Sequence, residues 1–273
     1  MGKALDFLDV VNSSGFPFQM AVAESVKRGK PDHNCRVLFT EHSWKDSADE
    51  YGGFIDLVVA SDIFPYVFVI ECKRHLPGEW LFLKAEGAGQ GRRHAKLFVN
   101  IVDRQKGQIG RSEWIDAPLE PATIESSFCV IPRQDNNNPM LERLASTLVH
   151  ATESLAHEDD RRVIATTRGE CLYISVLVTN ARLVVAELKP EDVSLESGTL
   201  RADAKVKTSN VPFLRFRKQL SFRKPEDDRR IFANNEYRLD YAKERTVFVV
   251  QAKFLGEFLK KFQVDIGWRE ALR

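Results

Sequence analysis

The chain has 273 residues, of which 43% are hydrophobic and 29% are charged, and its formal net charge is +1. This size and composition suit one large globular domain or two small ones, and the balanced charge excludes an overall basic protein. No apolar run approaches the roughly eighteen residues that a transmembrane helix needs, so we expect no membrane span.

Cysteine usage and the first residues of the chain indicate the compartment. The four cysteines are far apart and form no Cys-x-x-Cys pair; they are Cys35, Cys72, Cys129 and Cys171. Such scattered cysteines are typical of reduced residues in the cytosol. Asp6 lies where a signal peptide would be apolar. We therefore predict a cytoplasmic protein.

The N-terminal part of the chain predicts two helices and a strand. The first helix is short and covers residues 3–12, and the second covers Phe16–Arg28 and is stopped by a glycine and Pro31. Cys35–Thr40 has the composition of a strand. A polar loop over Glu41–Gly53 is expected to follow.

Two β-rich runs, Phe54–Ala60 and Val67–Lys73, flank a short loop, which is the pattern of a β-hairpin. Asp56 in the first run and Glu71 in the second lie equally far from the middle of the loop. A symmetric hairpin therefore places them directly opposite each other, with Cβ atoms about 5 Å apart. The strand period of two puts Lys73 on the same face as Glu71.

This face of the hairpin gathers two carboxylates and an ammonium among apolar residues. Burying such charges is costly unless they pair or bind a metal. Because neighbouring carboxylates repel each other, a divalent cation between Asp56 and Glu71 would resolve the conflict. Hard oxygen ligands favour Mg²⁺ or Mn²⁺ over zinc. The alternative is a structural ion pair between Lys73 and one of the two acids.

Asp56, followed by Glu71-Cys72-Lys73 at the end of a hydrophobic strand, resembles the PD-(D/E)xK signature of the restriction-endonuclease-like nucleases. The resemblance covers roughly residues 15–75, and Ile55 stands where valine or proline often precedes the aspartate. It implies an α/β fold with a mixed central β-sheet flanked by helices. We expect one such domain over residues 1–273, with its core hairpin at 53–74.

The same resemblance implies roles for individual residues. In this family the aspartate and the glutamate hold Mg²⁺, which assigns the metal to Asp56 and Glu71, with the Cys72 carbonyl as a further ligand. Lys73 would position the attacking water and stabilise charge on the phosphate. The family also tends to carry a glutamate on an upstream helix, and Glu24 lies in a region that resembles it. Helical periodicity alone leaves Glu24 in solvent, away from the apolar stripe of its helix.

The implied activity is Mg²⁺-dependent hydrolysis of phosphodiester bonds in nucleic acid, DNA rather than RNA, with Mn²⁺ as a possible substitute. One site per chain acting on both strands of a duplex would favour a homodimer with twofold symmetry. The alternative is a non-catalytic nucleic-acid-binding or assembly module that has kept the nuclease fold.

Two other places in the chain resemble the signature in part. Glu187-Leu188-Lys189 also closes an apolar strand, but the preceding run, Cys171–Val178, contains no acid to face Glu187. Asp203-Ala204-Lys205 lies in a polar stretch. Only the hairpin combines an upstream strand acid with a glutamate and a lysine on one face.

Basic residues concentrate in two segments, 84–111 and 201–224. The first is expected to be a basic insertion of loop and helix that leaves directly from the hairpin. In the second, Phe213–Arg217 alternates, so a strand would present both of its arginines on one face. The nucleic-acid-binding candidates are Arg92, Arg93, Lys96, Arg215 and Arg217. The alternative is solvated surface, because edge strands use charge to prevent aggregation.

The remaining elements follow from apolar runs and helical periodicity. A helix begins at Asn138-Pro139, and a second amphipathic helix covers Phe254–Phe262. The predicted strands are Trp80–Leu83, Phe128–Ile131, Val163–Thr167, Cys171–Val178, Leu183–Leu188 and Val247–Val250.

Overall fold

The structure is a computed structural model that describes residues 6–45, 52–75, 78–88, 91–103, 105–132, 139–159, 169–220 and 243–265. The strand predicted over Val163–Thr167 lies outside these residues. None of the helices in the described ranges is both long and apolar enough to cross a membrane.

The described residues form four α-helices, two 3₁₀ turns and fourteen strands. The helices are α1 (Phe7–Ser13), α2 (Phe16–His33), α3 (Met140–Glu158) and α6 (Leu255–Lys261), and the 3₁₀ turns are η1 (Pro190–Asp192) and η3 (Ala252–Phe254). The strands are β1 (Cys35–Lys45), β2 (Gly52–Ser61), β3 (Tyr66–Lys73), β4 (Glu79–Ala85), β5 (Arg92–Asp103), β6 (Gln108–Thr123), β7 (Glu125–Ser126), β8 (Phe128–Val130), β9 (Glu170–Thr179), β10 (Arg182–Leu188), β11 (Lys207–Val211), β12 (Phe213–Gln219), β13 (Glu244–Gln251) and β14 (Gln263–Val264).

Most strands join one mixed sheet of ten strands, with β9 at its centre. All ten residues of β9 are buried. This strand pairs in parallel with β3 on one side, and on the other with β13 in parallel and β5 antiparallel. The main path runs β1-β2-β3-β9-β13-β12-β7, so β1 and β2 lie toward one edge. A strand covered on both faces needs a continuous apolar run, which is what the sequence of β9 provides.

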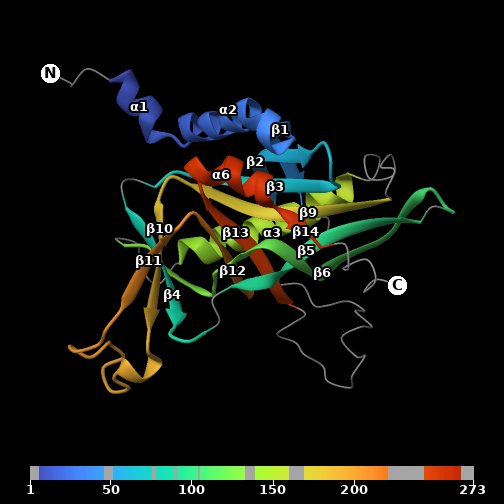
Figure 1. Ribbon diagram of the computed structural model, residues 1–273. Helices are drawn as coiled ribbons and strands as arrows, with labels where there is room; N and C mark the ends of the chain where they lie inside the picture. Colours follow the sequence, from blue (N-terminus) through green and yellow to red (C-terminus); the bar gives the residue numbers. More distant parts are fainter. Residues whose placement is uncertain are drawn as a thin grey trace.

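A second sheet of four strands, in the order β11-β10-β4-β8, lies beside the large sheet (Figure 1). Trp80 and Phe82 of β4 are fully buried in a cluster that also contains Leu148 of α3 and Val69 of β3. The small sheet and α3 therefore share the apolar core on one face of the large sheet.

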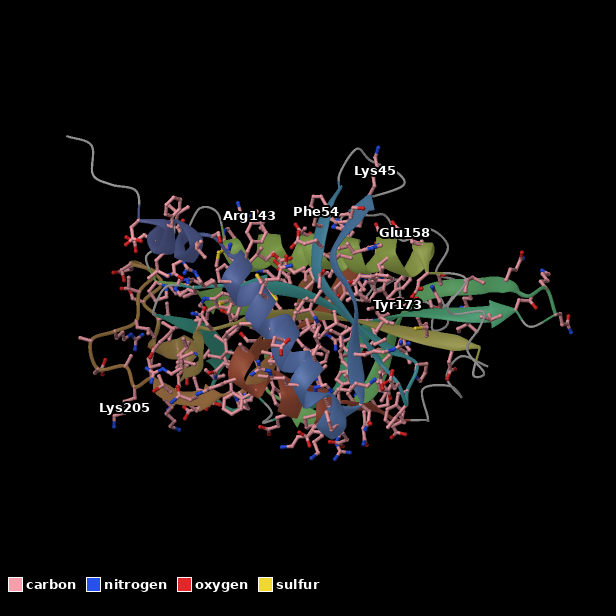
Figure 2. All side chains as sticks on the ribbon, turned by 90° about the horizontal axis from the view of Figure 1, so that it is seen from above. Lys45, Phe54, Arg143, Glu158, Tyr173 and Lys205 are labelled. Atoms are coloured by element: carbon pink, nitrogen blue, oxygen red, sulfur yellow. The ribbon has the colours of Figure 1, made fainter. Side chains whose placement is uncertain are left out.

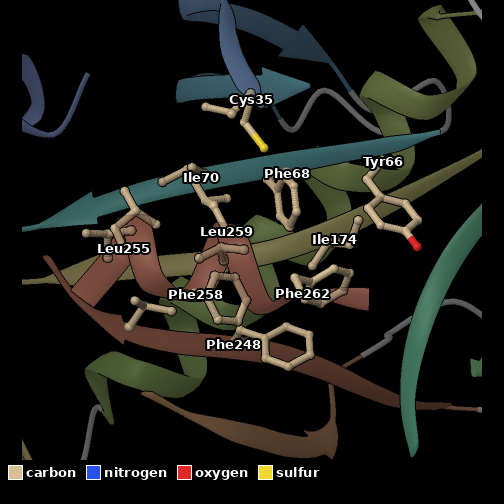
Figure 3. Close-up of a cluster of buried hydrophobic side chains, with 14 of the residues drawn as sticks. Cys35, Tyr66, Phe68, Ile70, Ile174, Phe248, Leu255, Phe258, Leu259 and Phe262 are labelled. Atoms are coloured by element: carbon tan, nitrogen blue, oxygen red, sulfur yellow. The ribbon is translucent and has the colours of Figure 1, made fainter. Parts of the chain in front are cut away.

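Helices α2 and α6 cover the opposite face of the large sheet (Figure 1). Figure 3 shows Phe258 of α6 and Phe262, which caps that helix, packed against Phe68 of β3 and Phe248 of β13. The ring centroids of Phe68 and Phe262 are 5.2 Å apart in an edge-to-face arrangement. Such pairs add to the free energy gained by burial. The apolar face of the amphipathic helix predicted over Phe254–Phe262 therefore belongs to the core.

Helix α2 is longer than the sequence predicts. Pro31, expected to stop it, lies inside the helix, which is capped by Asn34. Asn34 has a φ of 54°, and its main-chain N–H donates a hydrogen bond to the Lys30 carbonyl. Asparagine tolerates this left-handed conformation better than most residues. The cap, and not the proline, therefore sets the end of the helix.

The basic segment over residues 84–111 was predicted to be loop and helix, and this was wrong. Most of it belongs to β4, β5 and β6, and β5 and β6 form a long antiparallel hairpin (Figure 1). Ala95, Leu97 and Val99 alternate along β5 and are buried in the core beneath α2 and α6. The alternation of apolar and polar residues in this segment was therefore a strand signal.

Candidate active site

The β2–β3 hairpin has the register that the sequence predicts. Leu57 pairs with Ile70 and Ala60 with Val67, so the same register places Asp56 opposite Glu71. The pairing ends at this point, and an Asp56 carboxylate oxygen accepts a hydrogen bond of 2.6 Å from the main-chain N–H of Cys72. The Asp56 carboxylate is therefore fixed beside the end of β3.

The side chains of β3 alternate between the two faces of the sheet as expected. Ile70 and Cys72 belong to the apolar cluster beneath α2 and α6, whereas Val69 belongs to the cluster on the α3 side. Glu71 and Lys73 alternate along the strand with Ile70 and Cys72. They therefore lie on the same face as Val69. Both side chains are partly exposed, so solvent reaches this end of the hairpin.

The end of β3 is tied to the central strand. Lys73 is paired with Thr179 of β9, and the main-chain N–H of His75 donates a hydrogen bond of 2.7 Å to the side chain of Asn180. Because β9 is buried along its whole length, it provides a rigid support for Lys73.

Electrostatic conflict marks the two opposed carboxylates. Burial raises the pKa of Asp56 to about 6, although the hydrogen bond from Cys72 stabilises its charged form. Burial also raises the pKa of Glu71 to about 8, and repulsion from Asp56 contributes further. Lys73 lowers both pKa values but does not offset the other effects. Without a cation, burial and repulsion between carboxylates therefore disfavour the charged forms of both acids.

A third carboxylate, Glu41, lies next to this pair and was missed by sequence analysis. Its position on β1 falls between the pairs Thr40↔Leu57 and His42↔Ile55, which makes Asp56 its nearest neighbour on β2. Repulsion from Glu41 contributes to the raised pKa of Asp56. From the sequence this strand is expected to end at Thr40, with Glu41 in the following loop, whereas β1 continues to Lys45. Extending the strand by two residues would have brought Glu41 to the site.

Helix α2 contacts the site through Gln19 and not through Glu24. The Gln19 amide donates hydrogen bonds to the Glu41 carboxylate and, at 3.1 Å, to the main-chain carbonyl of Asp56. Glu24 is exposed and pairs with Arg28 at 2.7 Å, one turn further along the same helix. It shares with Glu41 only the wall of a hollow of about 690 Å³. The helical periodicity, which placed Glu24 in solvent, was the better guide.

Three of the five basic residues predicted to bind nucleic acid are buried. Arg215 is fully buried, donates to the Pro121 carbonyl at 3.3 Å and has its guanidinium 5.7 Å from the ring centre of Phe248. Lys96 is buried as well, and burial lowers its pKa to about 8. Neither side chain presents its charge to a phosphate at the surface, so their assignment as phosphate contacts is corrected.

Arg217 is the third buried residue of that set, and it is neutralised by acids. Its guanidinium lies 2.5 Å from a Glu244 carboxylate oxygen and 3.4 Å from one of Asp116. A buried guanidinium needs such partners, because an unpaired charge in the interior is very costly. Arg217 is therefore a structural residue, and its prediction as a phosphate contact is also corrected.

The remaining two candidates lie on β5. Arg93 is exposed and pairs with Glu120 across the hairpin at 3.1 Å. For Arg92 only the main chain is described, as part of the same strand. Arg93 is therefore the one residue of the predicted set whose described side chain is accessible to a partner.

The two partial matches to the signature have different surroundings from the hairpin. Glu187 on β10 pairs with Lys84 at 3.4 Å, and its neighbours across the strands are Lys84 and Lys207. Asp203 is exposed in a turn. Glu187 thus faces bases where Glu71 faces an acid. The sequence predicted no acid opposite Glu187 but expected Cys171–Val178 as its neighbour, whereas β10 pairs with β4 and β11.

The donor atoms at the hairpin are those that a hard cation prefers. Asp56 and Glu71 provide carboxylate oxygens, and the Cys72 carbonyl lies beside them in the chain. In the described part of the chain, no group of three or more histidine, cysteine, aspartate or glutamate side chains is arranged to hold a metal ion. A cation here would therefore have two carboxylates and main-chain or water oxygens as ligands. Mg²⁺ commonly binds through one or two carboxylates and retains several waters.

The fold places the chain in the broad class of α/β proteins. The chain is an α/β protein with a mixed sheet, and one hairpin of that sheet carries two opposed carboxylates and a lysine. Comparisons with protein-family models, with curated proteins and with solved structures find no match. Evidence for the function therefore comes from the residues of the site.

Proposed function

We propose that this protein is a metal-dependent nuclease of the restriction-endonuclease-like class, which hydrolyses phosphodiester bonds of nucleic acid, with DNA as the preferred substrate. The observation that carries the proposal is the register of the hairpin, which places Asp56 opposite Glu71 just beyond the last pair, Leu57↔Ile70. Lys73 follows on the same face, in the order that the nuclease signature requires.

The two carboxylates suit a divalent cation because burial and repulsion disfavour their charged forms, and a cation would offset both effects. Burial and mutual repulsion raise the pKa of Glu71 to about 8, and a cation between Asp56 and Glu71 would remove that repulsion. Oxygen ligands select Mg²⁺ or Mn²⁺. When bound, such a cation would lower the pKa of a water molecule and stabilise negative charge on the phosphate.

The chain's own residues supply position and charge. Asp56 is held by the Cys72 N–H, so its carboxylate needs little rearrangement to act as a ligand. Lys73 carries a compact ammonium with three donors, which suits a residue that orients a water molecule and a phosphate oxygen. Partial exposure of Glu71 and Lys73 leaves the site open to a large substrate.

A cleavage assay tests the proposal. Supercoiled plasmid, linear duplex, single-stranded DNA and RNA would each be incubated with the protein in Mg²⁺, in Mn²⁺ and in a chelator. We expect cleavage with either metal and none in the chelator, and we expect Asp56→Asn to abolish it. Binding of DNA with no cleavage in either metal would instead favour the non-catalytic module.

A further inference from the structure

Glu41 has a main-chain conformation that its residue type does not favour. Its φ is 53°, in the left-handed region that suits glycine and asparagine. The side chain is exposed, so apolar packing does not account for a glutamate here. Strained residues of this kind cluster at functional sites, where the surrounding structure holds them in place.

The structure that holds Glu41 is a buried amide. Gln19 is only 8% exposed, and its amide group donates both to the Glu41 carboxylate and to the Asp56 carbonyl. A single side chain on α2 thus connects Glu41 to the strand that carries Asp56. Glu24, on the same helix, makes no such connection, because its carboxylate pairs with Arg28.

We propose that Glu41 is an outer carboxylate of the metal site, that Gln19 positions it, and that it acts on the cation through a bound water molecule. This inference rests on the proposed function. Action through water agrees with the absence of a three-carboxylate cluster among the described residues, and with the waters that Mg²⁺ retains. Residues that act behind the direct ligands are worth about 10–100-fold in metal affinity.

Calorimetric titration of Mn²⁺ into the whole protein, without nucleic acid, tests the inference. Glu41→Asn removes the charge and keeps a residue that tolerates the left-handed conformation. Glu41→Gln keeps the length of the side chain. We expect both variants to bind Mn²⁺ about 10–100-fold more weakly. Glu24→Gln, from the same helix as Gln19, is the matched control and should bind like the unmodified protein.

A double variant separates positioning from a merely structural role. Gln19→Leu should weaken Mn²⁺ binding. The double variant Gln19→Leu/Glu41→Asn should bind little more weakly than Glu41→Asn alone, because both changes remove the same positioned Glu41 carboxylate. In the absence of metal, Glu41→Asn should unfold at the same temperature as the unmodified protein or higher, since it relieves backbone strain. If Glu41 had only a structural role, Glu41→Asn would instead unfold at a lower temperature than the unmodified protein.

The outcomes distinguish the two proposals. Mn²⁺ binding by the unmodified protein that is unchanged in Glu41→Asn and Glu41→Gln would overturn the role of Glu41 and leave the proposed nuclease intact. Additive losses in the double variant would overturn the positioning role of Gln19. No Mn²⁺ binding by the unmodified protein would overturn the proposed function itself.

Discussion

At the scale of single residues, the proposed metal site consists of two carboxylates that the fold brings together and whose pKa values it raises. Their opposition follows from strand period and loop symmetry, which is why Asp56 and Glu71 could be paired from sequence. Their protonation could not be predicted, because burial depends on neighbours that are distant in sequence. Glu41 is one such neighbour, brought in by the extra length of β1.

The raised pKa of Glu71 predicts how stability depends on pH. Its pKa lies near 8 in the folded protein and near its ordinary value of 4.5 in the unfolded chain. Between these values the folded state binds more protons, so this group's contribution to the free energy of unfolding falls as pH rises. We expect Glu71→Gln to be more stable than the unmodified protein at about pH 9, and not at about pH 4, in chelator. Urea denaturation measures this, and lower stability of the variant at the higher pH would contradict it.

Lys73 has a role that can be separated from metal binding. Lys73→Ala removes a charge beside the reacting groups and leaves both carboxylate ligands in place. We expect cleavage to fall by about 10²–10³-fold, the usual loss on removing one stabilising donor. Mn²⁺ affinity should not fall, because the lost ammonium is a positive charge that repels the cation. Lys73→Arg should not restore cleavage, since a planar guanidinium differs in shape from an ammonium. Loss of Mn²⁺ binding in Lys73→Ala would contradict this separation.

At the scale of elements, the symmetry of the hairpin was a reliable guide, whereas the strands of residues 84–111 and the long-range pairing were not predicted. The β2–β3 hairpin could be recognised from two runs and a loop, because all its contacts are local. The alternation of Phe213–Arg217 suggested one apolar face and one charged face, yet the arginines of β12 are buried. The acidic partners of Arg217, Asp116 and Glu244, come from other strands, so no local pattern reveals the burial.

The ion cluster around Arg217 is expected to stabilise the sheet. Arg217→Ala leaves the carboxylates of Asp116 and Glu244 without their shared cation. Breaking a buried pair in this way costs about 3–5 kcal/mol of folding free energy. Arg93→Ala, which removes an exposed pair with Glu120, should cost about 0–1 kcal/mol. Urea denaturation of both variants measures the difference. Equal effects would mean that burial does not distinguish the two arginines.

At the scale of the whole molecule, the two faces of the large sheet have different coverings. The general class, an α/β protein with a mixed sheet and flanking helices, was expected from the resemblance of the hairpin to the nuclease signature, and the sheet is indeed mixed. The separate four-stranded sheet could not be predicted, since β4 and β10 pair in parallel across almost a hundred residues. Figure 2 labels Lys45 and Phe54 near the ends of β1 and β2, and β1 is the edge strand of the large sheet's main path. The candidate site lies between these strands and β3.

Binding of a cation at this edge should stabilise the whole fold. A ligand present at 100 times its dissociation constant adds about 2.7 kcal/mol to the free energy of unfolding. For a chain of this size each kcal/mol raises the melting temperature by roughly 2–4 °C. We expect Mn²⁺ to raise the melting temperature of the unmodified protein and of Glu187→Gln, and not that of the double variant Asp56→Asn/Glu71→Gln. The same rise in the double variant would place the cation elsewhere.

The most direct test of the nuclease centre compares two glutamates that each precede a lysine by two positions. Glu71 faces Asp56, whereas Glu187 faces Lys84 and Lys207. Glu71→Gln, Glu187→Gln and the unmodified protein would be purified in parallel and assayed for cleavage of plasmid DNA in Mg²⁺. We expect Glu187→Gln to cleave at the same rate as the unmodified protein and Glu71→Gln not to cleave. Equal cleavage by Glu71→Gln and the unmodified protein would contradict this expectation.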